Sequence, residues 1–200
     1  MILNAEQHDS LIEVINIAFG RAAGSLSAIT GQRVLLNVPS VEICPIDQLQ
    51  AKLQTVIHGD VATVQQVFSG AVSGTALLMI DFDGALNLSG LLTDSRVPLQ
   101  RLDASDREVL MEVGNILLNA CLGTLGNVLK VHISFAVPRL HVESIGGLLG
   151  SLTIDKEELM VAMLVLTKFE LRDTSIGGYM VVVLGVSSLD KLLEAIAELG

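Results

Sequence analysis

The sequence predicts a mixed α/β fold of the α+β type, a pseudo-two-fold duplicated domain in which a sheet packs with two long repeat-related helices. These helices are predicted at 6–30 and 104–129, where apolar residues recur with helical period. Shorter apolar runs typical of strands follow each helix, and elements of the first half recur in the second half at a nearly fixed offset. Because no low-complexity linker separates the halves, residues 1–200 are expected to form one domain, with homologous halves at about 1–100 and 101–200.

The first half is expected to begin with a helix and an outer strand. Residues 6–30 carry a broad apolar stripe, and Gly31 can supply the left-handed cap that ends the helix. Residues 33–44 are predicted to form a strand, in which Pro39 is compatible with an edge position or a bulge. The other elements expected in this half are two strands and a short helix, at 65–68, 75–80 and 84–92.

The second half is expected to repeat this plan with an insertion. Its elements are a helix, a strand region, a pair of strands and a closing helix, at 104–129, 130–142, 159–171, 179–184 and 187–199. The glycine-rich segment 146–150 is predicted to be a turn near the insertion, because glycines mark turns and loops more often than element interiors.

The composition argues against several classes of function. A net charge of −10 with only 12 Lys and Arg residues disfavours nucleic acid, which basic side chains must neutralise. Cys44 and Cys121 are too widely spaced to suggest a disulfide framework or a zinc site. The apolar runs are short of the roughly 18 residues that span a bilayer, and the N-terminus does not resemble a signal peptide. The chain is therefore expected to be cytoplasmic, without membrane insertion.

Polar residues line one face of each long helix. Their spacing of four, three and four residues places them on the same side of the helix. The first stripe consists of Asp9, Glu13, Asn16 and Gly20, and the second of Glu108, Glu112, Asn115 and Asn119. Because the apolar positions lie elsewhere, both stripes are expected to face solvent or a partner.

A proline follows each Glu-x-x-Asn pair at the same distance. Asn16 lies 23 positions before Pro39 and Asn115 lies 23 positions before Pro138, so the pattern recurs with an offset of 99. An ordinary solvated helix face would explain a single copy. Two copies in register, with a matched proline, favour a functional site in each half.

The residue types in the stripes suit the positioning of water. Asn is a poor helix former, so its presence on both helices needs a reason. Its side chain offers a carbonyl acceptor and an amide donor, which together can hold a water molecule. A Glu one turn earlier can pair with a cation on a partner. Neither a Ser/His/Asp nor a Cys/His arrangement is evident, and therefore the pattern favours water positioning over covalent catalysis.

Both segments resemble the signature of the CheC/CheX/FliY family of chemotaxis phosphatases. They read Asp9-x-x-x-Glu13-x-x-Asn16 and Glu108-x-x-x-Glu112-x-x-Asn115, each with its proline after 22 further residues. Two signatures in one chain are typical of the CheC-like members, and the likeness covers nearly the whole chain. The resemblance implies a hydrolase, a response-regulator aspartyl-phosphate phosphatase whose partner is a phosphorylated CheY-like receiver domain.

The resemblance also implies roles for the paired residues. Asn16 or Asn115 would orient the water that attacks the aspartyl phosphate, and Glu13 or Glu112 would dock to the lysine of the partner's active site. No cofactor or metal of the chain's own is implied, because the phosphorylated partner supplies Mg²⁺. The alternative is a non-catalytic binding or scaffold protein in chemotaxis or the flagellar switch, for example an adaptor for CheD. Retention of Glu and Asn in both copies favours the phosphatase.

The two copies differ at the residue before the asparagine. The family usually has Gly there, and Gly114 matches it, whereas the first copy has Ile15. A bulky side chain that bordered the contact would restrict the approach of a partner, so the second site is expected to lie closer to the family pattern. Glu108 also stands where Asp or Ser is usual, which retains a polar group on a longer side chain.

Overall fold

A curled antiparallel sheet of seven strands runs through the computed structural model, which describes residues 4–93, 101–151, 160–171 and 174–197. The strands are β1 (Val34–Pro45), β2 (Asp60–Gly70), β3 (Gly74–Asp81), β4 (Ile133–Phe135), β5 (Arg139–Ser144), β6 (Met160–Leu171) and β7 (Thr174–Gly185). They follow the order β1-β6-β7-β3-β2, and both β4 and β5 pair with the remaining edge of β2.

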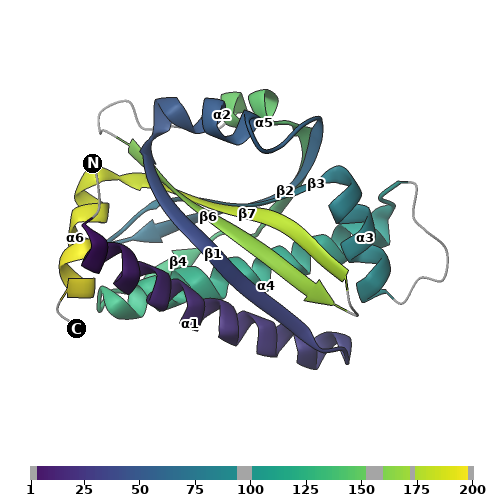
Figure 1. Cartoon of the computed structure of the whole chain (residues 1–200), viewed down its shortest axis with the longest axis horizontal. Coiled ribbons are helices and arrows are strands. Elements are labelled where there is room, and N and C mark those ends of the chain that lie inside the picture. Colours follow the sequence, from purple (N-terminus) through teal and green to yellow (C-terminus); the bar gives the residue numbers. More distant parts are fainter. Residues whose placement is uncertain (1–3, 94–100, 152–159, 172–173, 198–200) are drawn as a thin grey trace.

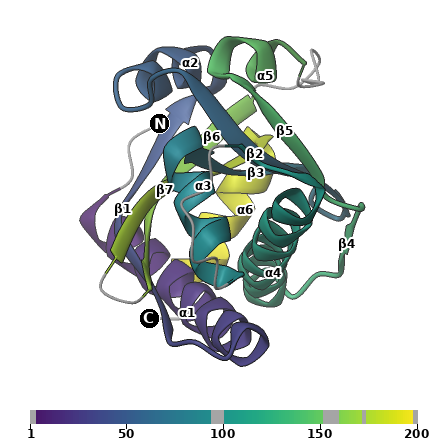
Figure 2. The ribbon, with the colours of Figure 1, turned by 90° about the vertical axis from the view of Figure 1, so that its right-hand side faces the viewer.

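Helices cover both faces of this sheet (Figure 1). They are α1 (Ala5–Thr30), α2 (Ile46–Gln54), α3 (Phe82–Leu92), α4 (Ala104–Val128), α5 (Ile145–Ser151) and α6 (Val186–Ala197). The long helices α1 and α4 lie side by side on one face, where α3 and α6 also pack, and α2 and α5 lie together over the other face (Figures 1 and 2).

The two halves follow the same order of elements. Each has a long helix, an outer strand, a short helix, two further strands and a last helix, with the outer strand of the second half divided into β4 and β5. In the sheet, β3 and β7 pair at the centre, β2 and β6 flank them, and β1 and β5 lie farther out. This is the arrangement of two halves related by a pseudo-two-fold axis between β3 and β7.

Side chains alternate between two cores, one on each face of the sheet. In β2, Val64 and Phe68 join the core beneath α1 and α4, whereas Val61 joins the core beneath α2 and α5. In β7, Val182 and Val181 divide in the same way. Because both faces are covered, the central strands carry nearly continuous apolar runs.

Most of the predicted elements are confirmed. Both long helices and the two strand pairs occur close to their predicted positions, although β2 and β7 are longer than expected. Gly31 caps α1 in the left-handed conformation, with a φ of 65°. The pairing of β1 with β6 shifts register between Asn37 and Ser40, which confirms a bulge at Pro39.

Two short helices were not expected from the sequence. No element was predicted at the position of α2, and the turn predicted at 146–150 is wrong, because this segment lies within α5. Ile145 and Leu148 are buried in the core beneath α2 and α5. Their burial stabilises a helix that its glycines would disfavour in isolation. The strand region predicted at 130–142 is also interrupted, between β4 and β5.

The long helices α1 and α4 are apolar enough to cross a membrane, by length and composition alone. The sequence prediction of apolar runs too short to span a bilayer therefore does not hold for these two helices. In the fold, both helices pack against the sheet and against each other, and their apolar stripes belong to the main core. Core helices of soluble proteins pass the same test of length and hydropathy.

Both cysteines are buried. Cys121 lies on α4 without exposed surface, and its burial raises the pKa of its thiol to about 12. Burial is also the main cause that raises the pKa of the Cys44 thiol in β1. Both thiols therefore stay protonated near neutral pH, and Cys121 packs as a small hydrophobe.

Acid is expected to weaken the start of α4 through the carboxylate of Asp103. The Asp103 side chain accepts a hydrogen bond of 3.0 Å from the backbone N–H of Asp106, and this bond is the main cause that holds the pKa of Asp103 below its ordinary value. A depressed pKa in the folded state stabilises the fold above the unfolded pKa of about 4, and this stabilisation is lost as the pH falls through the folded pKa.

The variant Asp103→Asn keeps an N-capping side chain without a titrating carboxyl. Thermal melts between about pH 6 and about pH 2 should therefore show a smaller acid-induced fall in Tm for Asp103→Asn than for the wild type. Equal falls in both proteins would contradict the role assigned to this carboxylate.

Candidate functional site

The two polar stripes lie on neighbouring helices, because α1 and α4 pack against each other (Figure 2). Glu13 and Asn16 of α1 are exposed. Glu112 of α4 is exposed as well, and Asn115 is half-buried. Each helix therefore presents one carboxylate and one amide, about one turn apart, on the side away from the sheet.

The apolar faces of the helices determine this orientation. α1 buries Leu11 and Ile15 in the main core, and α4 buries Val113 and Leu117 in the same core. The helical period then directs each Glu-x-x-Asn pair outward. The prediction that the stripes face outward is confirmed for the first stripe, whereas the asparagines of the second stripe are partly recessed.

The residue before each asparagine faces the interior of the protein. Ile15 is fully buried. Gly114 is also buried, and a Cβ atom added to it would lie 2.5 Å from both Cβ and Cγ1 of Val64 in β2. A buried Ile15 does not border a contact with a partner, so the restriction considered for a bulky side chain at this position does not arise. The glycine of the second copy instead allows α4 to approach the sheet closely.

A hydrogen bond holds the asparagine of the second site. The Nδ2 group of Asn119 donates to Oδ1 of Asn115 at 2.8 Å, across one turn of α4. The Oδ1 atom of Asn119 is buried without a hydrogen-bond partner. Sequence reasoning placed Asn119 in the stripe but missed this contact, which the spacing of four residues permits.

The first site is more open. Gly20 occupies the position that corresponds to Asn119, and a Cβ atom there would meet nothing within 4 Å. Within the part of the chain that the structure describes, the Asn16 side chain has no hydrogen-bond partner. Near the start of this stripe, the ring of His8 lies 3.1 Å from the carbonyl oxygen of Val41, which ties α1 to β1.

The two prolines of the repeated pattern lie in different surroundings. Pro39 belongs to the bulge of β1, whereas Pro138 lies between β4 and β5. The preceding residues differ accordingly, because Val38 is 8% exposed and Val137 is 85% exposed. Equal spacing in the sequence has therefore not kept equal burial of the residues that precede the prolines.

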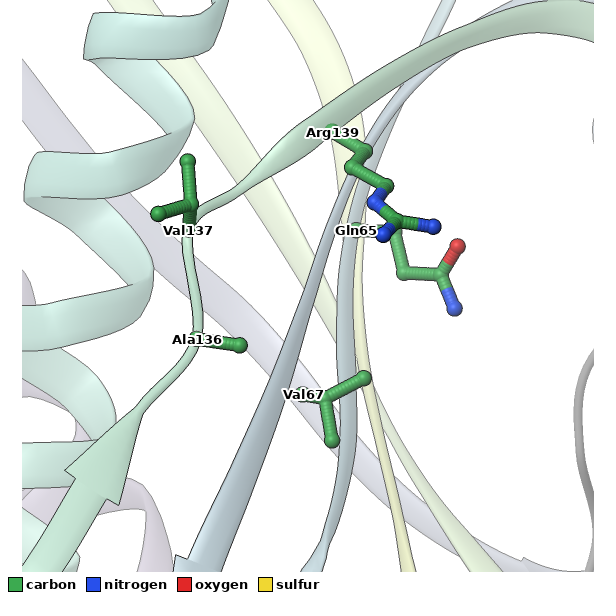
Figure 3. Close-up of a pocket in the computed structure, with 5 residues that line it drawn as sticks. All are labelled: Gln65, Val67, Ala136, Val137 and Arg139. Carbon is green, nitrogen blue, oxygen red and sulfur yellow. The ribbon is translucent and has the colours of Figure 1, made fainter.

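A hollow of about 560 Å³ lies beside this second proline (Figure 3). It is lined by Gln65, Val67, Ala136, Val137 and Arg139. Along β2, Gln65 and Val67 alternate with Val64 and therefore face away from α4. The hollow is thus separate from the two polar stripes and contains none of the predicted site residues.

The chemistry of both sites rests on a carboxylate and an amide. A carboxylate can pair with a cation of a partner, and an amide can donate to and accept from the same water molecule. Among the described residues, no three His, Cys, Asp or Glu side chains gather as metal ligands would. The arrangement suits the binding of a partner and the orientation of a water at that partner's surface.

The chain is similar in sequence to a flagellar protein. No family model matches the chain. It is 23% identical over 177 residues to the flagellar motor switch phosphatase FliY of Bacillus subtilis (strain 168). The aligned region covers 87% of this chain and 46% of that protein, so the chain spans about half the length of this relative.

Solved structures share the fold over nearly the whole chain. FliY of Thermotoga maritima superimposes with a TM-score of 0.79 at 19% identity, and the match covers 99% of both chains. The FliM middle domain from H. pylori has a TM-score of 0.70 at 12% identity, covering 96% of this chain and 99% of that one. These likenesses confirm the predicted α+β fold.

Proposed function

Because the chain belongs to the CheC/CheX/FliY family, we propose that it is a protein phosphatase that hydrolyses the aspartyl phosphate of a CheY-like response regulator. The phosphatase name of the Bacillus subtilis relative supports a hydrolase. The observation that carries the proposal is the Glu-x-x-Asn pair on the outer side of each of two adjacent helices.

In the proposed reaction, Glu13 or Glu112 docks to the lysine beside the phosphorylated aspartate of the receiver. Asn16 or Asn115 then holds a water molecule in line with the phosphorus atom. The water oxygen forms a bond to phosphorus, the bond from phosphorus to the aspartyl oxygen breaks, and the aspartate leaves as a carboxylate. The protons of the water pass to inorganic phosphate and solvent.

The chain needs no cofactor of its own in this scheme, since the receiver brings Mg²⁺ together with its phosphoryl group. Phosphoryl transfer requires mainly positioning and electrostatic stabilisation, which an amide and a docked carboxylate can provide. Because such receivers act inside the cell, the proposed location is the cytoplasm.

A non-catalytic scaffold is the second candidate function. The name of the Bacillus subtilis relative includes the flagellar motor switch, and a role in the assembly of such a switch is therefore the alternative. An adaptor for CheD belongs to the same class. A scaffold does not require the amides of Asn16 and Asn115, whereas in the phosphatase each amide holds the attacking water.

Turnover distinguishes the two functions. A purified CheY-like receiver phosphorylated on its aspartate should lose phosphate faster when the protein is present at about one-twentieth of the receiver concentration, with many receivers dephosphorylated per molecule. A scaffold would leave the decay at the receiver's own rate. A non-hydrolysable phosphoryl analogue on the receiver should compete, because it occupies the same docking site.

A further inference from the structure

The two sites differ in what holds the asparagine. In the second site, the Nδ2 group of Asn119 donates to Oδ1 of Asn115 at 2.8 Å. In the first site, the corresponding position is Gly20, which has no side chain to offer Asn16. The difference therefore concerns the orientation of the amide that the proposed reaction uses.

A side-chain amide has two unlike ends, and its last torsion angle is broad and nearly two-fold. A free asparagine can thus present either its oxygen or its NH₂ group outward. The bond from Asn119 directs Oδ1 of Asn115 toward α4's next turn. The Nδ2 group of Asn115 has no hydrogen-bond partner among the described residues. It is not fully buried either, because it is absent from the buried polar atoms that lack a partner. It therefore stays available to a ligand.

The bond has a structural cost. Asn119 keeps its own Oδ1 atom buried without a hydrogen-bond partner. A buried unpaired acceptor destabilises a fold, and most buried polar side-chain atoms have partners. An arrangement that keeps this atom unpaired is expected where the other end of the side chain serves a function.

From these contacts we infer that Asn119 is a positioning residue for the phosphatase reaction. This inference rests on the proposed function. It presents the Nδ2 group of Asn115 to the phosphoryl site, where this group can donate to a phosphoryl oxygen. The second lone pair of Asn115 Oδ1 remains free to accept from the attacking water. The second site is consequently the faster of the two, because Asn16 lacks such a partner.

The second site is tested alone in an Asn16→Ala background. There, Asn119→Ala should lower kcat for phosphoryl loss by roughly 3- to 10-fold, the effect of one hydrogen bond, with KM unchanged. Asn119→Asp has nearly the same shape, but an ionised carboxylate only accepts hydrogen bonds. It should attract the NH₂ group of Asn115, turn the amide around, and lower kcat further than the alanine does.

The first site provides the matched gain of function. In an Asn115→Ala background, Gly20→Asn places an amide four residues after Asn16, at an exposed position where an added Cβ meets nothing within 4 Å. The side chain fits without repacking, so kcat should rise by roughly 3- to 10-fold.

A test of the second site that needs no activity assay uses the protein with Asn115 in place. The side-chain NH₂ signals of Asn115 in an NMR spectrum should shift when Asn119 is replaced by Ala, which reports the hydrogen bond directly.

Unchanged kcat in an active protein carrying Asn119→Ala or Gly20→Asn would overturn the positioning role. A kcat for Asn119→Asp at or above that of Asn119→Ala would overturn the assigned orientation. Failure of the wild type to accelerate phosphoryl loss would instead refute the proposed function, and this inference with it.

Discussion

Joint replacement of Asn16 and Asn115 by alanine is expected to abolish the acceleration of phosphoryl loss. Removing a preorganised polar group from such a site lowers a rate by about 100-fold or more. Both sites lose the amide that holds the water, while the carboxylates of the two stripes remain. The decay of aspartyl phosphate in a purified receiver, measured with a small amount of protein, should return to the receiver's own rate.

The fold should survive this double replacement. Asn16 is exposed and Asn115 is half-buried, and alanine is the better helix former at both positions. Far-UV circular dichroism should thus match that of the wild type, and thermal melts should show only a small loss, because Asn119 loses the acceptor for its Nδ2 group. Asn127→Ala is the matched control, because this exposed asparagine lies near the end of α4, outside the stripe. If the double variant kept the wild-type rate, the catalytic assignment would be wrong and a scaffold would be the better account.

The long elements could be predicted from the sequence because their patterns are local. α1 and α4 repeat apolar residues with helical period over many turns, and the strand pairs carry apolar runs between turn residues. The short helices could not be predicted in the same way. α5 contains Gly146, Gly147 and Gly150, and its helical form depends on contacts with α2 and the sheet, which lie far away in the sequence.

The candidate site shows the same division. The spacing of Glu13 and Asn16, or of Glu112 and Asn115, is enough to place each pair on the outer side of a helix. The role of the residue before the asparagine depends on tertiary contacts. Gly114 contacts a strand 50 positions away at Val64, and nothing in the local pattern distinguishes this contact from a surface that a partner approaches.

The replacement Gly114→Ala is expected to have the largest effect on stability of any single change near the second site. The added Cβ would lie 2.5 Å from Cβ and Cγ1 of Val64 and 2.7 Å from its Cγ2. Because the Val64 Cβ is attached directly to the backbone of β2, the clash can be relieved only by moving the helix or the strand. Overpacking of this kind lowers the free energy of unfolding by about 1–3 kcal/mol. This loss exceeds the gain expected from the higher helix propensity of alanine.

Gly123→Ala, on the same helix, separates packing from propensity. A Cβ atom at Gly123 meets nothing within 4 Å, so this variant should gain about 0.5–1 kcal/mol from the better helix former. Urea unfolding of both variants should therefore show midpoints that move in opposite directions. Adding Val64→Ala to Gly114→Ala removes two of the three close atoms and should make the pair less destabilising than the sum of the single changes. A Gly114→Ala protein as stable as Gly123→Ala would instead show that close packing of α4 on β2 does not require the glycine.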